Sequence, residues 1–264
     1  MIRAVTLGIL QGLTEFLPVS SSGHLVLAQD LLGMDTPGIT FEVVLHVGTL
    51  LAVLAVYGRD LVGITRGVLG WDTTFRTRES RRLALWIILG SVPAALVGIG
   101  LKSHVEVLFN SVLAVGMALI MTGFILWASG GKTKGNRQVA SLGPLGAVWI
   151  GLAQAAAILP GISRSGATVS AGFHLGLKPP EAARFSFLLS VPAVAGAALV
   201  DALDAPWDGF PASFLLVGAL SASLTGYAAI RVLLWVLARG RLRAFSYYCF
   251  ALGLLAITWH FAGA

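Results

Sequence analysis

Charged residues are scarce in this sequence of 264 residues. Asp, Glu, Lys and Arg together make up 11% of it, against roughly 25% in ordinary soluble domains. Hydrophobic residues make up 56%. Because so few charges cannot cover the surface of a water-soluble fold, the composition excludes one or two soluble domains, although the length alone would allow them. The sequence predicts an integral membrane protein.

Cysteine is almost absent as well. The single Cys249 excludes an intramolecular disulfide and any CxxC metal or redox motif, and its place in an apolar run is typical of a buried packing residue. The formal charge of +6 does not indicate a nucleic-acid partner. Many of the basic residues cluster in short connections between apolar runs, as in the cytoplasmic loops of membrane proteins. We expect no nucleic acid and no organic cofactor.

Six apolar segments are long enough to cross a membrane as helices, which takes about 17–25 residues. They cover residues 41–57, 83–101, 112–128, 183–202, 214–238 and 245–261. Four shorter apolar pieces form two pairs, 4–17 with 24–32 and 144–159 with 166–177, and a stretch rich in Pro, Ser and Gly interrupts each pair. We interpret each pair as a re-entrant helix-loop-helix hairpin, which enters the membrane and returns to the same face. The predicted fold is therefore all-α, with six transmembrane helices plus two re-entrant hairpins.

Basic residues in the connections predict the orientation. The connections 58–82, 129–141 and 239–243 carry clusters of Arg and Lys, so we expect them in the cytoplasm. The connection 102–110 is nearly neutral and 201–208 carries three Asp, so we expect these two outside. Following the chain through these assignments places both termini on the external face.

The two halves of the chain, approximately 1–128 and 144–264, share a pattern. An offset of 143 residues superposes Gly8 on Gly151, Gln11 on Gln154, Ser20 on Ser163, Ser22 on Ser165, Gly23 on Gly166 and Ala28 on Ala171. Each half contains one hairpin and three spans, and because three is odd, the second half runs upside down relative to the first. The sequence predicts a single membrane domain over 1–264, built as an inverted-topology repeat with broken helices near the middle of the bilayer.

Polar residues around the break of the first hairpin predict a chemical site. They are Gln11, Glu15, Ser20, Ser21, Ser22 and His24. Gln11 and Glu15 are four residues apart and so share one helix face. A hydroxyl, a carboxylate and an imidazole that converge in a medium of low dielectric constant are the parts of an activated nucleophile. The structural alternative is that the serines only cap a broken helix, and the presence of Glu15 and His24 beside them favours the functional interpretation.

The break of the second hairpin carries one Arg among small and hydroxyl-bearing residues. These residues are Gly161, Ser163, Arg164, Ser165, Gly166 and Thr168. Arginine stays charged and its planar fork binds phosphate, and backbone N–H groups at a helix start also bind anions. A structural alternative pairs Arg164 with Glu15, and the two are compatible because an Arg that awaits phosphate needs a counter-ion. Together the hairpins predict phosphoryl transfer on a lipid phosphate.

A transporter is the alternative from a different class. Inverted repeats, broken helices and an anion site at the membrane midplane are also typical of secondary transporters. A lipid-phosphate flippase or an anion transporter would use Arg164 in the same way. It would not need Glu15, Ser21 and His24 around a nucleophilic hydroxyl, so the pattern favours an enzyme.

The motifs of both hairpins resemble those of a known family. Residues 11–24 match (E/Q)xxxE followed by PVSS(S/T)GH, residues 160–168 match PGxSRSxxT, and residues 41–53, FEVVLHVGTLLAV, are also similar. In motifs, length and segment order the sequence resembles the undecaprenyl pyrophosphate phosphatase family, the bacitracin-resistance type of integral membrane phosphatase. The resemblance implies a phosphoric anhydride hydrolase of the bacterial inner (plasma) membrane. Such an enzyme converts undecaprenyl pyrophosphate to undecaprenyl phosphate plus inorganic phosphate, and so recycles the lipid carrier for peptidoglycan and cell-wall synthesis.

The resemblance also implies roles for the site residues. Ser21 would be the nucleophile with Glu15 and His24 acting around it, or His24 would itself be the nucleophile, and Arg164 would hold the pyrophosphate. The substrate-binding residues implied are Gln11, Ser20, Ser22, Gly161, Ser163, Ser165, Gly166 and Thr168. The family also implies a divalent cation, Mg or Ca, near Glu15 and Gln11, although Gln11 stands where many members have Glu. The expected partners are the polyprenyl pyrophosphate lipid and membrane lipids, and a homodimer is left open.

Overall fold

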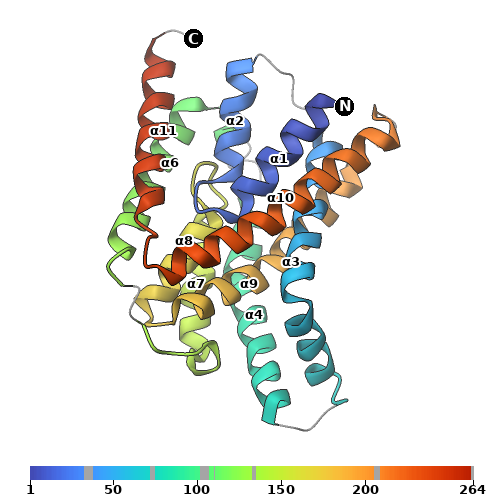
Figure 1. Ribbon diagram of the computed structural model, residues 1–264, viewed down its shortest axis with the longest axis vertical. Coiled ribbons are helices and arrows are strands. Elements are labelled where there is room, and N and C mark those ends of the chain that lie inside the picture. Colours follow the sequence, from blue (N-terminus) through green and yellow to red (C-terminus); the bar gives the residue numbers. More distant parts are fainter. Residues whose placement is uncertain are drawn as a thin grey trace.

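The computed structural model describes residues 1–32, 38–71, 75–101, 107–109, 111–132, 135–204 and 209–262. Within these ranges the fold is all helical, as predicted, and contains eleven helices, one of them a short 3-10 turn, and no strand (Figure 1). The helices are α1 (Ile2–Phe16), α2 (Ser21–Leu32), α3 (Gly38–Val68), α4 (Phe75–Gly100), α6 (Val112–Ser129), η1 (Val139–Ser141), α7 (Gly143–Ala156), α8 (Arg164–His174), α9 (Pro179–Asp204), α10 (Ala212–Ala238) and α11 (Ala244–Phe261). Most residues of the two predicted external connections, including 102–106 and Asp208, lie outside the described residues. Lys134, in a predicted cytoplasmic connection, also lies outside them.

Six of the described helices are long and apolar enough to cross a membrane. They are Thr40–Val68, Arg78–Gly100, Val112–Ser129, Pro179–Leu203, Ala212–Ala238 and Ala244–Phe261. Each covers one of the six predicted spans to within a residue. Large apolar side chains such as Phe124, Leu220 and Leu224 are exposed on the outer faces of these helices. Such exposure is unfavourable in water and favourable in the hydrocarbon of a membrane. The helices are thus compatible with a multi-pass membrane protein.

The first span differs from its predicted end. The sequence places this end at Tyr57, where the apolar run stops, but α3 continues to Val68. Tyr57 has a non-helical conformation, with φ of −111° and ψ of 16°, so the helix bends there and goes on as a more polar segment. Hydropathy detects where the apolar run stops, and a helix that leaves the hydrocarbon keeps its backbone hydrogen bonds.

Two pairs of shorter helices, α1 with α2 and α7 with α8, are separated by tight breaks where the sequence predicts them. Ser20, between α1 and α2, has a φ of 70°, and Gly161, between α7 and α8, has a φ of 96°. Positive φ is disfavoured for residues with a Cβ atom, so Ser20 is held there by its surroundings. Its hydroxyl accepts a hydrogen bond from the Gly23 N–H at 3.3 Å, which caps the start of α2.

Glycines allow two of the shorter helices, α1 and α7, to lie close to the long helices α10 and α4. The helix α1 packs along α10, and α7 packs along α4. A Cβ atom on Gly8 would lie 2.6 Å from the Gly218 carbonyl oxygen, and one on Gly151 would lie 2.3 Å from the Gly90 carbonyl oxygen. Small residues of this kind permit close backbone contact between membrane helices.

Gly151→Ala is expected to destabilise the protein, because the added methyl group must push the α4 backbone away. Overpacking of this kind costs about 1–3 kcal/mol of unfolding free energy, which thermal denaturation of the detergent-solubilised protein would detect as a lower midpoint. Gly196→Ala on α9 is the matched control, because a Cβ atom there meets nothing within 4 Å. Equal midpoints for the two variants would contradict the packing described.

Candidate active site

The breaks of the two helix pairs contact each other. The Ser165 hydroxyl donates a hydrogen bond to the Leu17 carbonyl oxygen at 3.2 Å, and a Cβ atom on Gly23 would lie 3.2 Å from the Cα atom of Gly161. Residues almost 150 positions apart therefore meet at one place. The sequence predicts this convergence, and the contacts bring the candidate residues of the two breaks together.

Glu15 links the two breaks through its carboxylate. Its Oε2 atom accepts a hydrogen bond from the Ser21 hydroxyl at 2.7 Å and another from the Gln11 amide at 3.1 Å. Its Oε1 atom forms an ion pair with Arg164 Nη2 at 2.5 Å, and the two charged side chains are 8% and 14% exposed. The ion pair between Glu15 and Arg164, which the sequence analysis gives as the structural alternative, is present. Because a buried charge needs a partner, each of these two groups stabilises the other in place.

Two polar atoms of this cluster have no protein partner among the described residues. They are Gln11 Oε1 and Arg164 Nη1, and both are buried. An unsatisfied buried polar atom costs roughly 1–3 kcal/mol, and such atoms in native proteins call for an explanation. Arg164 Nη1 is a charged donor, suited to an oxygen of phosphate. Gln11 Oε1 is an acceptor, suited to a cation or to a hydroxyl group.

The two ring nitrogens of His24 bond groups other than Ser21 within the described part of the chain. Its Nδ1 atom lies 2.7 Å from the Ser20 carbonyl oxygen, and its Nε2 atom lies 2.7 Å from the hydroxyl of Tyr248 on α11. The group that bonds the Ser21 hydroxyl is therefore the Glu15 carboxylate. The sequence analysis missed Tyr248, because nothing in the local pattern connects residues 224 positions apart.

The second break is held by a residue of α6 that the sequence analysis also missed. The Thr122 hydroxyl donates to the Gly161 carbonyl oxygen at 2.9 Å and accepts from the Ser163 N–H at 3.0 Å. The Ser163 hydroxyl accepts from the Gly166 N–H at 3.1 Å and lies 3.2 Å from the Ser165 hydroxyl. These bonds fix the conformation in which α8 begins.

Thr168 lies one turn into α8 and is buried. Its hydroxyl donates to the Arg164 carbonyl oxygen at 2.8 Å and lies 2.6 Å from the hydroxyl of Ser186 on α9. The first turn of α8 is thereby connected to a span. Of the other candidates, Ser20 and Ser22 lie with their hydroxyls 3.3 Å apart.

The site offers few protein ligands for a metal ion. Groups of three or more His, Cys, Asp or Glu that could hold one do not occur within the described part of the chain. Both Glu15 oxygens are already bonded, which leaves Gln11 Oε1 as the available oxygen. Mg²⁺ usually keeps several waters and binds one or two carboxylates together with substrate phosphates. These residues fit a cation that the substrate phosphates hold, with Gln11 and Glu15 beside it.

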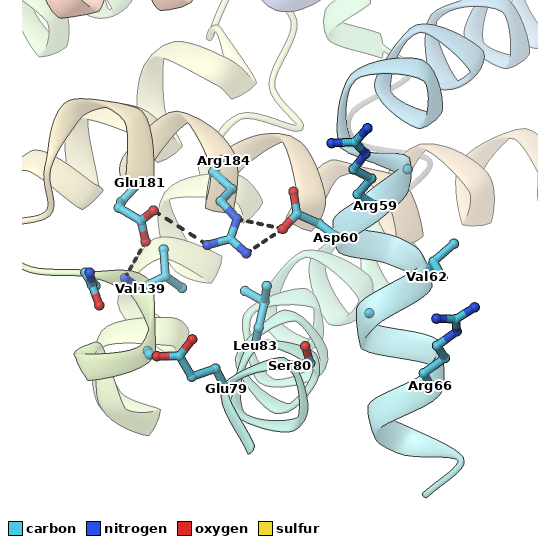
Figure 2. A pocket seen from close by; sticks show the side chains of 14 residues that line it. Arg59, Asp60, Val62, Arg66, Glu79, Ser80, Leu83, Val139, Glu181 and Arg184 are labelled. Atoms are coloured by element: carbon cyan, nitrogen blue, oxygen red, sulfur yellow. Dashed lines mark hydrogen bonds and ion pairs between the residues drawn. The ribbon is translucent and has the colours of Figure 1, made fainter. Parts of the chain in front are cut away.

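A cavity of about 790 Å³ lies elsewhere, between the end of α3 and the starts of α4 and α9 (Figure 2). Arg184 extends into it and pairs with Asp60 at 2.5 Å and with Glu181 at 3.5 Å. Glu181 also accepts a hydrogen bond from the Val139 N–H at 3.0 Å. These contacts connect α9 with α3 and η1. The residues that line the cavity include none of the candidate site residues, so the bonded cluster around Glu15, and not cavity size, marks the candidate site.

The sequence is similar to known proteins over nearly its whole length. Residues 4–255 match the family described as bacitracin resistance protein BacA. An undecaprenyl-diphosphatase of Desulfosudis oleivorans is 48% identical over 263 residues, which cover 96% of each chain. Two others, from Rubrobacter xylanophilus and Halothermothrix orenii, are 43% and 42% identical over 262 and 258 residues, which cover 97% of this chain and 96% of each relative. The matched region includes both breaks and every candidate site residue.

Proposed function

The chain belongs to the BacA family of undecaprenyl-diphosphatases, and we propose that it hydrolyses undecaprenyl pyrophosphate with Ser21 as the nucleophile and Arg164 as the phosphate clamp. As a phosphatase of this family it breaks a phosphoric anhydride bond. The products are undecaprenyl phosphate, the lipid carrier reused in cell-wall synthesis, and inorganic phosphate. The observation that carries the proposal is the Glu15 carboxylate, which bonds the Ser21 hydroxyl on one oxygen and Arg164 on the other.

The first step transfers the terminal phosphoryl group to Ser21. Arg164 binds a terminal phosphate oxygen through the unpartnered Nη1 atom, while Nη2 stays on Glu15. Glu15 Oε2 takes the hydroxyl proton as the Ser21 oxygen forms its bond to phosphorus. The bond from phosphorus to the bridging oxygen breaks, and its electron pair leaves with undecaprenyl phosphate. Arg164 and the backbone N–H groups at the start of α8 stabilise the charge in the transition state.

The second step regenerates the enzyme. Glu15, after losing its proton to solvent, removes a proton from a water molecule that attacks the phosphorus of phosphoserine. The bond from phosphorus to the Ser21 oxygen breaks, inorganic phosphate leaves, and Ser21 recovers its proton from Glu15. The alternative in which His24 is the nucleophile has weaker support, because Nε2 of His24 is bonded to Tyr248.

A divalent cation forms part of the proposal. When bound to the pyrophosphate, it neutralises charge on the phosphate oxygens. Gln11 Oε1 is the protein atom that would hold it, with the Glu15 carboxylate beside it. Since Gln11 replaces a carboxylate of many relatives, we expect weak cation binding by the protein itself, with the substrate supplying most of the ligands.

Gln11→Glu is expected to lower the Mg²⁺ concentration that gives half the maximal rate. The added carboxylate faces the same buried position and favours a cation there, so we expect a decrease of about tenfold, equivalent to roughly 1.4 kcal/mol. Gln11→Met, which removes the oxygen without adding charge, is the comparison. An unchanged Mg²⁺ dependence in both variants would place the cation away from Gln11.

The proposed architecture is a single domain of two inverted halves, approximately 1–128 and 144–264, each with a re-entrant hairpin. The same local contacts recur in both halves at the predicted offset of 143 residues, and this supports the architecture. Ser20 caps the Gly23 N–H just as Ser163 caps the Gly166 N–H. The packing of α1 against α10 corresponds to the packing of α7 against α4.

The proposed orientation puts both termini outside the bacterial inner membrane. The start of α1 and the end of α11 lie toward one end of the molecule, and the end of α3 and the start of α4 lie toward the other (Figure 1). This second end carries the basic residues of connection 58–82, which supports its cytoplasmic placement.

A homodimer stays a prediction.

Phosphate release by the purified protein in detergent tests the proposed function. With undecaprenyl pyrophosphate as substrate, we expect many turnovers per molecule and the formation of undecaprenyl phosphate. A transporter has no gradient to act on in detergent and would release no phosphate. Family membership favours hydrolysis over transport. Folded protein that binds the lipid without cleaving it would overturn the proposal.

A further inference from the structure

The start of α11 lies against the first break at two consecutive residues. The Tyr248 hydroxyl lies 2.7 Å from His24 Nε2, and the two rings are parallel, with their planes inclined by 1° and their centroids 5.7 Å apart. The next residue, Cys249, is fully buried, and its thiol points to the Pro18 carbonyl oxygen at 3.6 Å. A helix from the far end of the chain thus contacts both sides of the break that carries Ser21.

The hydrogen bonds of His24 assign its tautomer. The Ser20 carbonyl oxygen, 2.7 Å from Nδ1, can only accept, so Nδ1 carries a hydrogen. In a neutral imidazole, Nε2 is then the acceptor, and the Tyr248 hydroxyl donates to it. The one free lone pair of His24 therefore points at Tyr248. A hydroxyl can also accept, so the same contact persists when His24 is protonated.

The hydrogen bond between His24 and Tyr248 determines which group can accept the Ser21 proton. A histidine that served as base for Ser21 would direct Nε2 at its hydroxyl, as in the pairing of serine with histidine in hydrolases. Here that nitrogen is occupied, and the Ser21 hydroxyl donates to Glu15 instead. With the Tyr248 bond removed, the His24 ring would lose the contact that holds Nε2, and His24 could turn and compete for the serine hydroxyl.

We propose, on the basis of the phosphatase function proposed above, that Tyr248 is a positioning residue for the reaction. The Ser20 carbonyl oxygen selects the Nδ1–H tautomer of His24, and the Tyr248 hydroxyl holds the Nε2 atom away from Ser21, so that the Ser21 proton goes to Glu15. Substrate binding through Arg164 does not depend on this contact. Loss of the hydroxyl therefore acts on turnover more than on affinity.

Tyr248→Phe tests this role, with Tyr247→Phe as the matched control. Phenylalanine keeps the ring that packs beside His24 and removes only the hydroxyl. We expect kcat with undecaprenyl pyrophosphate to fall about tenfold, the effect of one lost hydrogen bond, while KM stays within about twofold. Tyr247 is the neighbouring residue and is more exposed than Tyr248. Its variant is expected to have wild-type kcat and KM.

Nitrogen-15 NMR of histidine-labelled protein supplies a readout that does not depend on activity. The His24 signals, identified by their loss in His24→Gln, are expected to show a protonated Nδ1 and a hydrogen-bonded Nε2. In Tyr248→Phe the Nε2 signal is expected to move, and in Tyr247→Phe to stay. A wild-type spectrum with the proton on Nε2, or wild-type kcat in Tyr248→Phe, would overturn the proposal. If the wild type cleaves no substrate, the phosphatase proposal fails, and the spectra still test the Tyr248 contact.

Discussion

Arg164→Lys is expected to lower kcat/KM for undecaprenyl pyrophosphate by about 100-fold or more, although it keeps the positive charge. Arg164 uses one nitrogen for Glu15, and its second nitrogen, Nη1, is buried and has no partner among the residues that the structure describes. The single ammonium group of a lysine cannot hold a carboxylate and a phosphate oxygen in this fixed geometry. Arg164→Ala removes the charge as well, and we expect a loss of at least about 1,000-fold.

Steady-state phosphate release by purified variants of confirmed fold measures this effect. Arg231→Lys on α10 is the control, because Arg231 is exposed, and we expect it to retain wild-type turnover. An Arg164→Lys variant that keeps half of the wild-type kcat/KM would remove Arg164 from the catalytic residues.

Ser21→Ala and Glu15→Gln are each expected to reduce kcat by about 1,000-fold or more, because nucleophile and base act as one unit. For the same reason, the double variant should be little worse than either single variant. Glu15→Gln also leaves Arg164 buried without its counter-charge, which costs about 3–5 kcal/mol of stability. Its folded fraction must therefore be measured alongside its rate. Ser213→Ala, which removes an exposed hydroxyl at the start of α10, should retain wild-type activity.

Rapid quenching of the reaction with undecaprenyl pyrophosphate that carries a label in its terminal phosphate identifies the nucleophile. We expect label on Ser21 and acid-stable phosphoserine in the digest. Label on His24, as an acid-labile phosphohistidine, would contradict the serine mechanism and support the histidine alternative. Tyr248→Phe sharpens the comparison, because it frees the nitrogen that the histidine mechanism needs.

The spans and the helix breaks could be predicted from the sequence because their causes are local. A run of apolar residues is required to cross hydrocarbon, and Pro, Ser and Gly interrupt helices wherever they cluster. The pairing of Glu15 with Arg164 was predictable for a further reason, since buried charges in a membrane need partners and few are available. The bend of α3 at Tyr57 was not predicted, because hydropathy marks where the apolar run stops and not where a helix bends.

The contacts that orient the site depend on packing, and the sequence analysis missed them. Thr122 is 39 residues from Gly161, and Tyr248 is 224 residues from His24. A threonine or a tyrosine in an apolar span is common in membrane helices and carries no signal of its own. The packing of α11 against the first break and of α6 against the second break identifies them.

The central claim is that Glu15, Ser21 and Arg164 form one pyrophosphate site. A structure of the protein with a non-hydrolysable prenyl pyrophosphate analogue tests it most directly. We expect the terminal phosphate at Arg164 Nη1, with its phosphorus within van der Waals contact of the Ser21 hydroxyl oxygen. Phosphate density beside Arg184, in the cavity between α3, α4 and α9 (Figure 2), with the Glu15 cluster unchanged, would contradict it.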